Sequence, residues 1–318
     1  MIKKIILVVV ICLISINTWS QTRFQTSFNE KVGQSIVQLN YSWSGFNKTN
    51  NNISFNIDKY ELQNSYADFK KPPKEDLRNH VNELLKKDIE QINASQNNYK
   101  IEMQPVQSSN YFTYRVSGKI NKPLVSKIEE ALKYRERKYS EDYFKSNYFL
   151  WNEKDSLVSI DYSRISKIYI PKMISVANAF KIKNNKDIYN KKVVINDILS
   201  FYQSIPYDTL TEDRGEGFST PLRFLHENKG DCDTKLVAIN ATVKALYPDV
   251  KTIAVILPNH VLMGFAVPSN NNKDKKVMYK GVTYLLTETA GPALIPLGVI
   301  DPKNEAVMMT RNYSITEL

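Results

Sequence analysis

The chain has 318 residues, of which 24% are charged, and a formal net charge of +10 at pH 7. A chain of this length has room for two ordinary domains. Because the positive charge is spread along the sequence, it favours contact with anionic surfaces only weakly. The apolar run at 252–268 is interrupted by Pro258, Asn259 and His260, so we expect no stable transmembrane segment.

The amino terminus has the pattern of a secretory signal peptide. Lys3 and Lys4 give a positive start, residues 5–16 are almost wholly apolar, and a short polar stretch ends at Ser20. This apolar run is too short for a comfortable membrane-spanning helix. We therefore expect residues 1–20 to be removed, and the mature chain to be exported to the periplasm or the extracellular space, at most tethered by an uncleaved signal.

Removal of the signal would take Cys12 with it and leave Cys232 as a lone cysteine. A lone cysteine in an oxidising compartment has no partner for an internal disulfide. Three interpretations are open at this point: an intermolecular disulfide, a free reactive thiol, or a buried cysteine that acts as a small apolar residue.

Residues 21–150 predict a separate N-terminal α+β domain, to which the pattern assigns no role. Apolar and polar residues alternate at 37–43 and at 53–57, which indicates two strands joined by an Asn-rich turn. Apolar positions recur at helical spacing at 77–92 and again at 125–143. Strand-like runs lie between these two helices, and no residue of the region has catalytic spacing.

A run of basic and aromatic residues lies in the second of these helices, at 133–139. Such interleaving occurs in nucleic-acid binders, but it is also common on the solvated face of a helix. Because an exported protein rarely meets RNA or DNA, we interpret the run as a solvated face and expect no nucleic-acid partner.

Residues 151–318 contain the chemically informative motifs. The stretch KGDCDTK at 229–235 is followed by apolar positions at helical spacing up to residue 246, so Cys232 should lie in the first turn of a buried helix. A helix N-terminus favours the thiolate, which is the nucleophilic form, whereas Asp231 and Asp233 oppose it. The thiol therefore needs a cationic partner as well.

His260 and Glu288 are the candidates that would complete a thiol triad. His260 is predicted to open a strand after a Pro-Asn turn, and Glu288 lies on a following strand. A carboxylate there can accept a hydrogen bond from the imidazole and fix its tautomer. One cysteine with two nearby histidines, His226 and His260, lacks the paired spacing of a metal site, so we expect no metal and no cofactor. His226 is expected to serve packing or to face solvent.

These motifs resemble the catalytic core of the transglutaminase-like superfamily of papain-type thiol enzymes. The resemblance runs from about residue 160 to 300, and its most specific parts are Gly-Asp-Cys at a helix start, a histidine opening a strand, and YLLTET at 284–289. It implies an α+β fold with a papain-like core in residues 151–318. It also implies Cys232 as nucleophile, His260 as general base and acid, and Glu288 as orienting acid, where many members have Asp.

The triad predicts acyl transfer through a thioester on Cys232. For the oxyanion we expect two donors, the backbone N–H of Cys232 and the side chain of Gln203. We favour hydrolysis of amide bonds in a protein or peptide substrate, including cell-wall peptides, since nothing indicates a lysine-acceptor tunnel or calcium-site loops. Protein crosslinking or deamidation is an alternative, and so is a binding or scaffold protein that keeps the core without catalysis.

Overall fold

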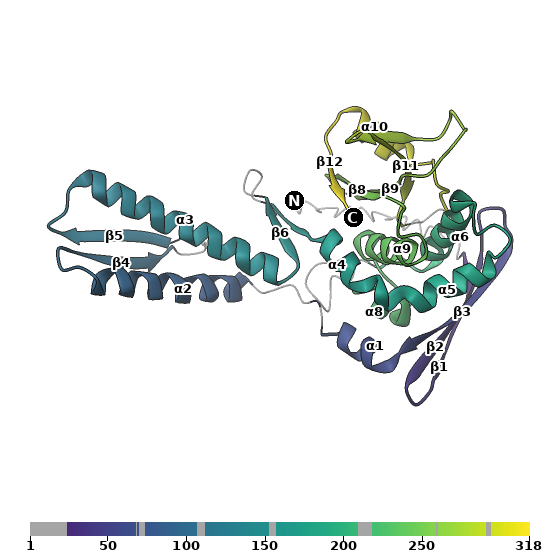
Figure 1. Ribbon diagram of the computed structural model, residues 1–318, viewed down its shortest axis with the longest axis horizontal. Helices are drawn as coiled ribbons and strands as arrows, with labels where there is room; N and C mark the ends of the chain where they lie inside the picture. Colours follow the sequence, from purple (N-terminus) through teal and green to yellow (C-terminus); the bar gives the residue numbers. More distant parts are fainter. Residues whose placement is uncertain are drawn as a thin grey trace, which may run out of the picture.

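The computed structural model describes residues 24–67, 69, 74–106, 112–152, 157–208, 218–258, 260–290 and 294–318. The signal peptide expected at 1–20 lies outside these residues. The described chain is a mixed α+β structure, as the sequence predicts. It consists of a body, in which helices lie between two sheets, and an arm that projects to one side (Figure 1).

The chain enters the body through a three-stranded antiparallel sheet of order β1-β2-β3. Its strands, and the helix that follows them, are β1 (Gln25–Val32), β2 (Ile36–Ser44), β3 (Asn50–Asp58) and α1 (Lys59–Ser65). The strands predicted at 37–43 and 53–57 are confirmed, and their alternate side chains are buried on one face. β1 is mostly exposed, so no hydrophobic alternation marks it in the sequence.

The arm consists of two long helices and a β-hairpin. Its elements are α2 (Lys74–Ala94), β4 (Tyr99–Pro105), β5 (Phe112–Gly118) and α3 (Lys122–Ser146). Their apolar side chains form two small clusters, one around Leu85 and one around Leu132. Most side chains of the basic and aromatic run at 133–139 are exposed, as on a solvated helix face.

The helices of the body form its middle layer. A hairpin of β6 (Phe149–Asn152) and β7 (Leu157–Ile160) joins the arm to them. They are α4 (Tyr162–Tyr169), the 3₁₀ helix η1 (Pro171–Met173), α5 (Ile174–Lys183), α6 (Lys191–Ser204), α8 (Pro221–Glu227) and α9 (Cys232–Leu246). α9 is buried from Thr234 to Val243, because α4, α5, α6 and α8 pack around it and β9 covers another side.

The second sheet has five strands in the order β10-β11-β9-β8-β12. Its strands and the helix beside it are β8 (Thr252–Leu257), β9 (His260–Phe265), β10 (Lys276–Tyr279), β11 (Val282–Glu288), α10 (Pro302–Met309) and β12 (Ser314–Glu317). Val261, Met263 and Phe265 belong to the core shared with α9, whereas Leu262 belongs to the cluster that α10 covers. Alternate residues of β9 therefore face opposite sides of the sheet.

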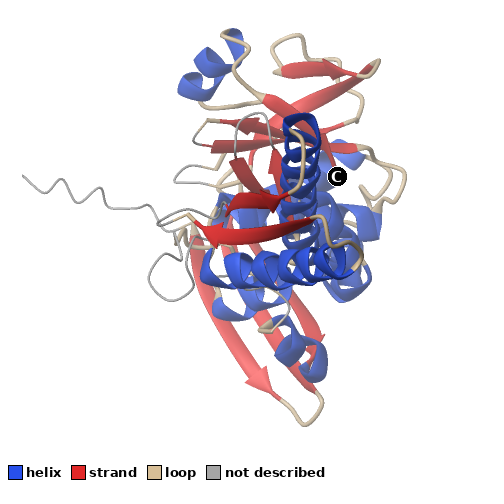
Figure 2. Cartoon of the chain, turned by 90° about the vertical axis from the view of Figure 1, so that its left-hand side faces the viewer, coloured by secondary structure: helices blue, strands red, loops and turns tan. Residues whose placement is uncertain are grey.

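The structure divides the chain differently from the sequence, which predicts a boundary near residue 150. The inward face of β2 and β3 belongs to the same buried core as α5, α6, α8 and α9, and Figure 2 shows the long N-terminal strands beside these helices. Trp43 Nε1 donates to Ser200 Oγ (2.9 Å), and the Tyr41 hydroxyl donates to the Leu225 carbonyl. The N-terminal sheet is therefore part of the body, and the segment that stands apart is 74–146.

Candidate active site

Cys232 is the first residue of α9, as the sequence predicts. Asp231 is the N-cap, and its carboxylate accepts a hydrogen bond from a backbone N–H of the first turn (2.8 Å). Glycine is required at 230, because a Cβ on Gly230 would lie 2.6 Å from the Phe224 ring of α8. Backbone hydrogen bonds join Gly230 to the segment 206–208, so this segment lies beside the half-buried cysteine.

Burial raises the pKa of the Cys232 thiol above its ordinary value, and the carboxylates of Asp233 and Asp231 raise it further. The backbone N–H groups of Asp233 and Cys232 lower it. The expected effect of the helix N-terminus is present, but burial and the two acids outweigh it. Burial, followed by the charge of Asp233, also raises the pKa of Asp231 to about 7. In the resting protein the sulfur is therefore a neutral thiol at pH 7.

His260 and Glu288 lie on the neighbouring strands β9 and β11, and 2.5 Å separates His260 Nε2 from Glu288 Oε2. The other carboxylate oxygen, Oε1, accepts hydrogen bonds from the Asp301 backbone N–H and from Asn304 Nδ2, at 2.9 Å each. Both donors belong to the start of α10, so this helix fixes the carboxylate. With Nε2 bound to Glu288, Nδ1 is the imidazole nitrogen that can exchange a proton with a substrate.

Asp233 contacts the thiol, and its charge interacts with that of His260. Its Oδ1 lies 3.7 Å from the Cys232 sulfur and accepts a hydrogen bond from the Tyr162 hydroxyl of α4 (2.9 Å). Burial raises the pKa of Asp233, whereas the hydrogen bonds of Tyr162 and Cys232 and the charge of His260 lower it. Among the described residues, the sulfur is hydrogen-bonded to Asp233 and not to His260. Such catalytic hydrogen bonds are often long before a substrate binds.

Gln203 is buried in the last turn of α6, and its contacts do not fit the expected role as an oxyanion donor. Nε2 donates to the carbonyls of Glu288 and Ile295, both at 2.9 Å, and Oε1 accepts from the Ile295 N–H (2.7 Å). A side-chain amide has two N–H hydrogens, and both are used here. Gln203 instead fastens the end of β11 to α6. The sequence does not predict this role, because Ile295 lies 92 positions away from Gln203.

Three other side chains belong to the site although the sequence did not predict a role for them. Tyr162 holds Asp233, and Asn304 holds Glu288, but neither belongs to a motif. Lys235 follows Cys232 by three residues and is fully buried, with Nζ 2.5 Å from a backbone carbonyl. Its place within KGDCDTK was a usable signal, because residues i and i+3 share a helix face.

His226 lies on α8, and its contacts connect this helix to the N-terminal part of the body. Nδ1 is 2.7 Å from the Tyr66 hydroxyl, and Nε2 is 3.2 Å from Glu30 Oε2 of β1. The packing role expected for His226 fits these contacts.

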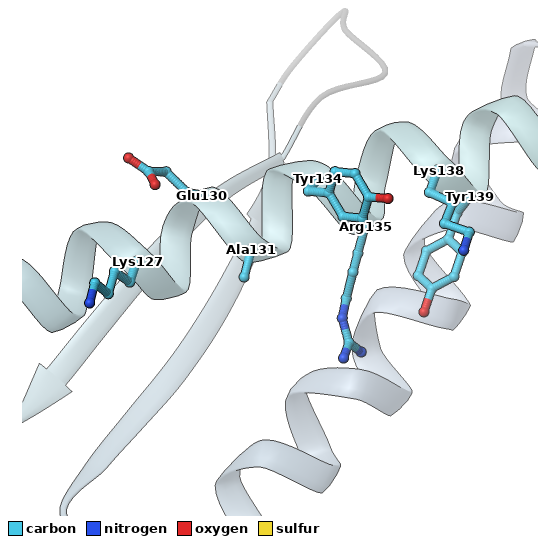
Figure 3. A pocket seen from close by; sticks show the side chains of 7 residues that line it. All are labelled: Lys127, Glu130, Ala131, Tyr134, Arg135, Lys138 and Tyr139. Carbon is cyan, nitrogen blue, oxygen red and sulfur yellow. The ribbon is translucent and has the colours of Figure 1, made fainter.

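A surface groove of ≈ 680 Å³ lies on the arm, along α3 (Figure 3). Arg135 and Tyr139 bind Asp88 of α2 there, through Nη1 and the hydroxyl, at 2.6 Å each. The residues that line the groove are Lys127, Glu130, Ala131, Tyr134, Arg135, Lys138 and Tyr139. This set contains no cysteine or histidine, so the groove does not have the thiol and imidazole groups found around Cys232.

Comparisons of the chain with protein-family models, with curated proteins and with solved structures found no match. The geometry of the site therefore carries the functional assignment. Within the described parts of the chain, no three metal-binding side chains gather around a common point. No helix in those parts is both long and apolar enough to cross a bilayer.

Proposed function

We propose that this protein is a transglutaminase-like thiol enzyme with a papain-type core, which hydrolyses amide bonds through a thioester on Cys232. The observation that carries the proposal is the 2.5 Å hydrogen bond between His260 and Glu288, in the sheet that packs against the cysteine helix. An imidazole oriented by a carboxylate can take a proton from a nucleophile and return it to a leaving group. Glu288 is only 2% exposed, so solvent screens this pair weakly.

The raised pKa of the thiol favours general-base catalysis over a preformed thiolate–imidazolium pair. As Cys232 Sγ attacks the carbonyl carbon of an amide, a C–S bond forms and His260 Nδ1 takes the thiol proton. This proton then passes to the amide nitrogen, the C–N bond breaks, and the amine leaves a thioester behind. Water next attacks the thioester, its proton passes through His260 to the sulfur, and a carboxylic acid and the free thiol are released.

The oxyanion of each step requires donors that are fixed in advance. The backbone N–H groups of Cys232 and Asp233 suit this role, because both lie in the first turn of α9 and both stabilise negative charge on the sulfur. The first N–H groups of a helix have no partner within the helix, so they are free to bind an anion. These two donors take the place of the Gln203 side chain.

The proposed substrate is a protein or peptide met after export, and cell-wall peptides are among the candidates. Export rests on the signal-peptide pattern of residues 1–20. Crosslinking and deamidation proceed through the same thioester. They differ from peptide hydrolysis in the acceptor or in the amine that leaves, so product analysis distinguishes the three reactions.

A second candidate is a binding or scaffold protein that keeps this core without catalysis. Two observations favour it: the pKa of the Cys232 thiol is raised, and the sulfur is hydrogen-bonded to Asp233 in place of His260. In such a protein the thiol would stay protonated and inert, and His260 would only brace the sheet.

The test is acylation of the purified protein by p-nitrophenyl acetate, which releases coloured p-nitrophenolate as a thioester forms on Cys232. We expect His260→Ala to slow acylation by about 10²–10⁴-fold, the usual contribution of a positioned acid–base group. The matched control is His226→Ala, which removes a histidine bound to Tyr66 and Glu30 and should leave the rate unchanged. Equal rates in the wild type and His260→Ala would favour the scaffold.

A further inference from the structure

Lys235 is the fourth residue of the buried helix α9, and its side chain is 0% exposed. It follows Cys232 by three residues, so these two side chains lie on one face of the first helical turns. A buried ammonium group costs several kcal/mol in lost hydration, and lysine is rarely found fully buried without a partner. The position therefore calls for a group that stabilises its charge.

The Lys235 ammonium group lies at the end of α6. Nζ donates to the Ile205 carbonyl at 2.5 Å, and Ile205 is the C-cap of α6. The carbonyl end of a helix carries a partial negative charge that favours a cation. Lys235 thus joins the end of α6 to the start of α9, where Cys232 begins the helix.

The charges of Lys235 and Cys232 are coupled. Burial lowers the pKa of Lys235 to about 7, whereas the negative charges of Asp231 and Cys232 raise it. By reciprocity, a protonated Lys235 favours the ionised form of the sulfur by the same free energy. The neutral thiol of the resting protein and the near-neutral pKa of Lys235 fit a pair that charges together when the sulfur loses its proton.

The other titratable groups around the thiol do not supply this charge at the sulfur. Carboxylates repel a thiolate, neutral phenols carry no charge, and in the resting site the His260 imidazole is hydrogen-bonded to Glu288 and not to the sulfur. These groups are Asp231 and Asp233 on α9, Tyr162 on α4, Tyr207 in the segment after α6, and His260 on β9, which interacts with Asp233.

We propose that Lys235 is a positioning residue of this site. Its buried ammonium group compensates the negative charge of the Cys232 sulfur and holds the end of α6 beside the start of α9. This deepens the proposed function, because a thioester enzyme regenerates an anionic sulfur each time the acyl group leaves. The sequence pattern requires a cationic partner for a thiol between two aspartates. Lys235 supplies that partner from the thiol's own helix, in addition to His260.

The test is the rate of Cys232 alkylation by iodoacetamide in the full-length protein from pH 6 to 10. We expect Lys235→Met to raise the alkylation pKa by about one unit, which slows alkylation about tenfold near pH 6, where Lys235 is charged. The matched control is Lys244→Met, which removes a lysine from the last turn of the same helix and should leave the profile unchanged. A methionine of similar size at 235 also removes the cost of the buried charge, so the variant should fold.

A double variant separates charge compensation from packing. In Asp231→Asn combined with Lys235→Met, a repelling and an attracting charge are removed together, and asparagine remains a good N-cap. We expect the alkylation pKa to return toward the wild-type value. A Lys235→Met profile identical to that of the wild type would overturn the proposal, and so would a double variant with no recovery.

The coupling is also measurable with Lys235 in place, should Lys235→Met fail to fold. We expect the pKa of Lys235, followed by ¹³C NMR at Cε, to rise in Cys232→Asp, because a carboxylate then supplies the negative charge that the neutral thiol lacks. An unchanged Lys235 titration would contradict the inference. These results do not depend on His260. If His260→Ala is acylated slowly but the pKa of Lys235 does not shift, only the role of the lysine is refuted. If His260→Ala is acylated at the normal rate and the pKa of Lys235 does shift, only the triad is refuted.

Discussion

Among the described residues, the arm and the body each bury one glutamate whose two oxygens are both hydrogen-bonded, and these two glutamates differ in their partners. In the arm, Glu136 accepts from the Tyr114 hydroxyl (2.7 Å) and from the Phe112 N–H (3.3 Å), and burial raises its pKa. In the body, one oxygen of Glu288 accepts from the first turn of α10 and the other meets His260. A buried carboxylate can assist proton transfer near neutral pH only where its partner exchanges a proton there, as an imidazole can and the phenol of Tyr114, with its raised pKa, cannot.

The two regions also contain a similar clamp made by a side-chain amide. In the arm, Asn93 binds the N–H and the carbonyl of Ile101, at 2.8 and 3.0 Å. In the body, Gln203 binds the same two groups of Ile295 and, in addition, the carbonyl of Glu288. The first clamp joins the end of α2 to the strand β4 that follows it, whereas the second connects distant segments at the candidate site.

The largest difference between the regions should appear when each glutamate is replaced by glutamine. We expect Glu288→Gln to slow acylation by p-nitrophenyl acetate by about 10²–10⁴-fold, because the amide no longer orients and stabilises the His260 imidazolium. Glu136→Gln should leave acylation unchanged. If both variants acylate at the wild-type rate, Glu288 is as structural as Glu136 and the comparison fails.

The amide clamps should differ in what their loss costs. Gln203→Ala removes three buried hydrogen bonds, so we expect a loss of about 3 kcal/mol in the free energy of unfolding, measured with urea. Asn93→Ala removes two bonds at a partly exposed position and should cost about 1–2 kcal/mol, without an effect on acylation. A Gln203→Ala variant with wild-type stability and about 10²–10³-fold slower acylation would restore the oxyanion role.

The smallest expected effect is a difference in how Lys235 of the body and Glu136 of the arm make the free energy of unfolding depend on pH. The pKa of Lys235 is about 7 when folded and about 10.4 when unfolded, so between these values the unfolded chain binds more protons and stability rises with pH. The pKa of Glu136 is raised on folding, so its contribution is complete below about pH 4.3 and is lost as the pH rises through the folded value.

Urea unfolding of the wild type, Lys235→Met and Glu136→Gln at pH 4, 6, 8 and 10 measures both contributions. We expect the advantage of Lys235→Met over the wild type to shrink from pH 7 to pH 10, and that of Glu136→Gln to grow above pH 4. Parallel curves for all three proteins would show that neither group changes its protonation on folding.

The sequence by itself determined the elements whose signals are local. Capping and periodicity place Cys232 at the first turn of a buried helix, and strand alternation places His260 and Glu288 on strands. The long helices of the arm follow from helical spacing in the same way. Each of these features depends on residues a few positions apart, so the pattern is visible without knowledge of the fold.

Only the tertiary structure decided how these elements share a core and what each polar side chain binds. The N-terminal sheet joined the body because β2 packs on a helix more than a hundred residues later, as the Trp43–Ser200 bond with a separation of 157 positions illustrates. Gln203 and Lys235 likewise bind backbone groups that are distant in the sequence, those of Ile295 and Ile205. The state of the thiol also depended on burial, which outweighed the helix N-terminus, and burial is a property of the whole fold rather than of neighbouring residues.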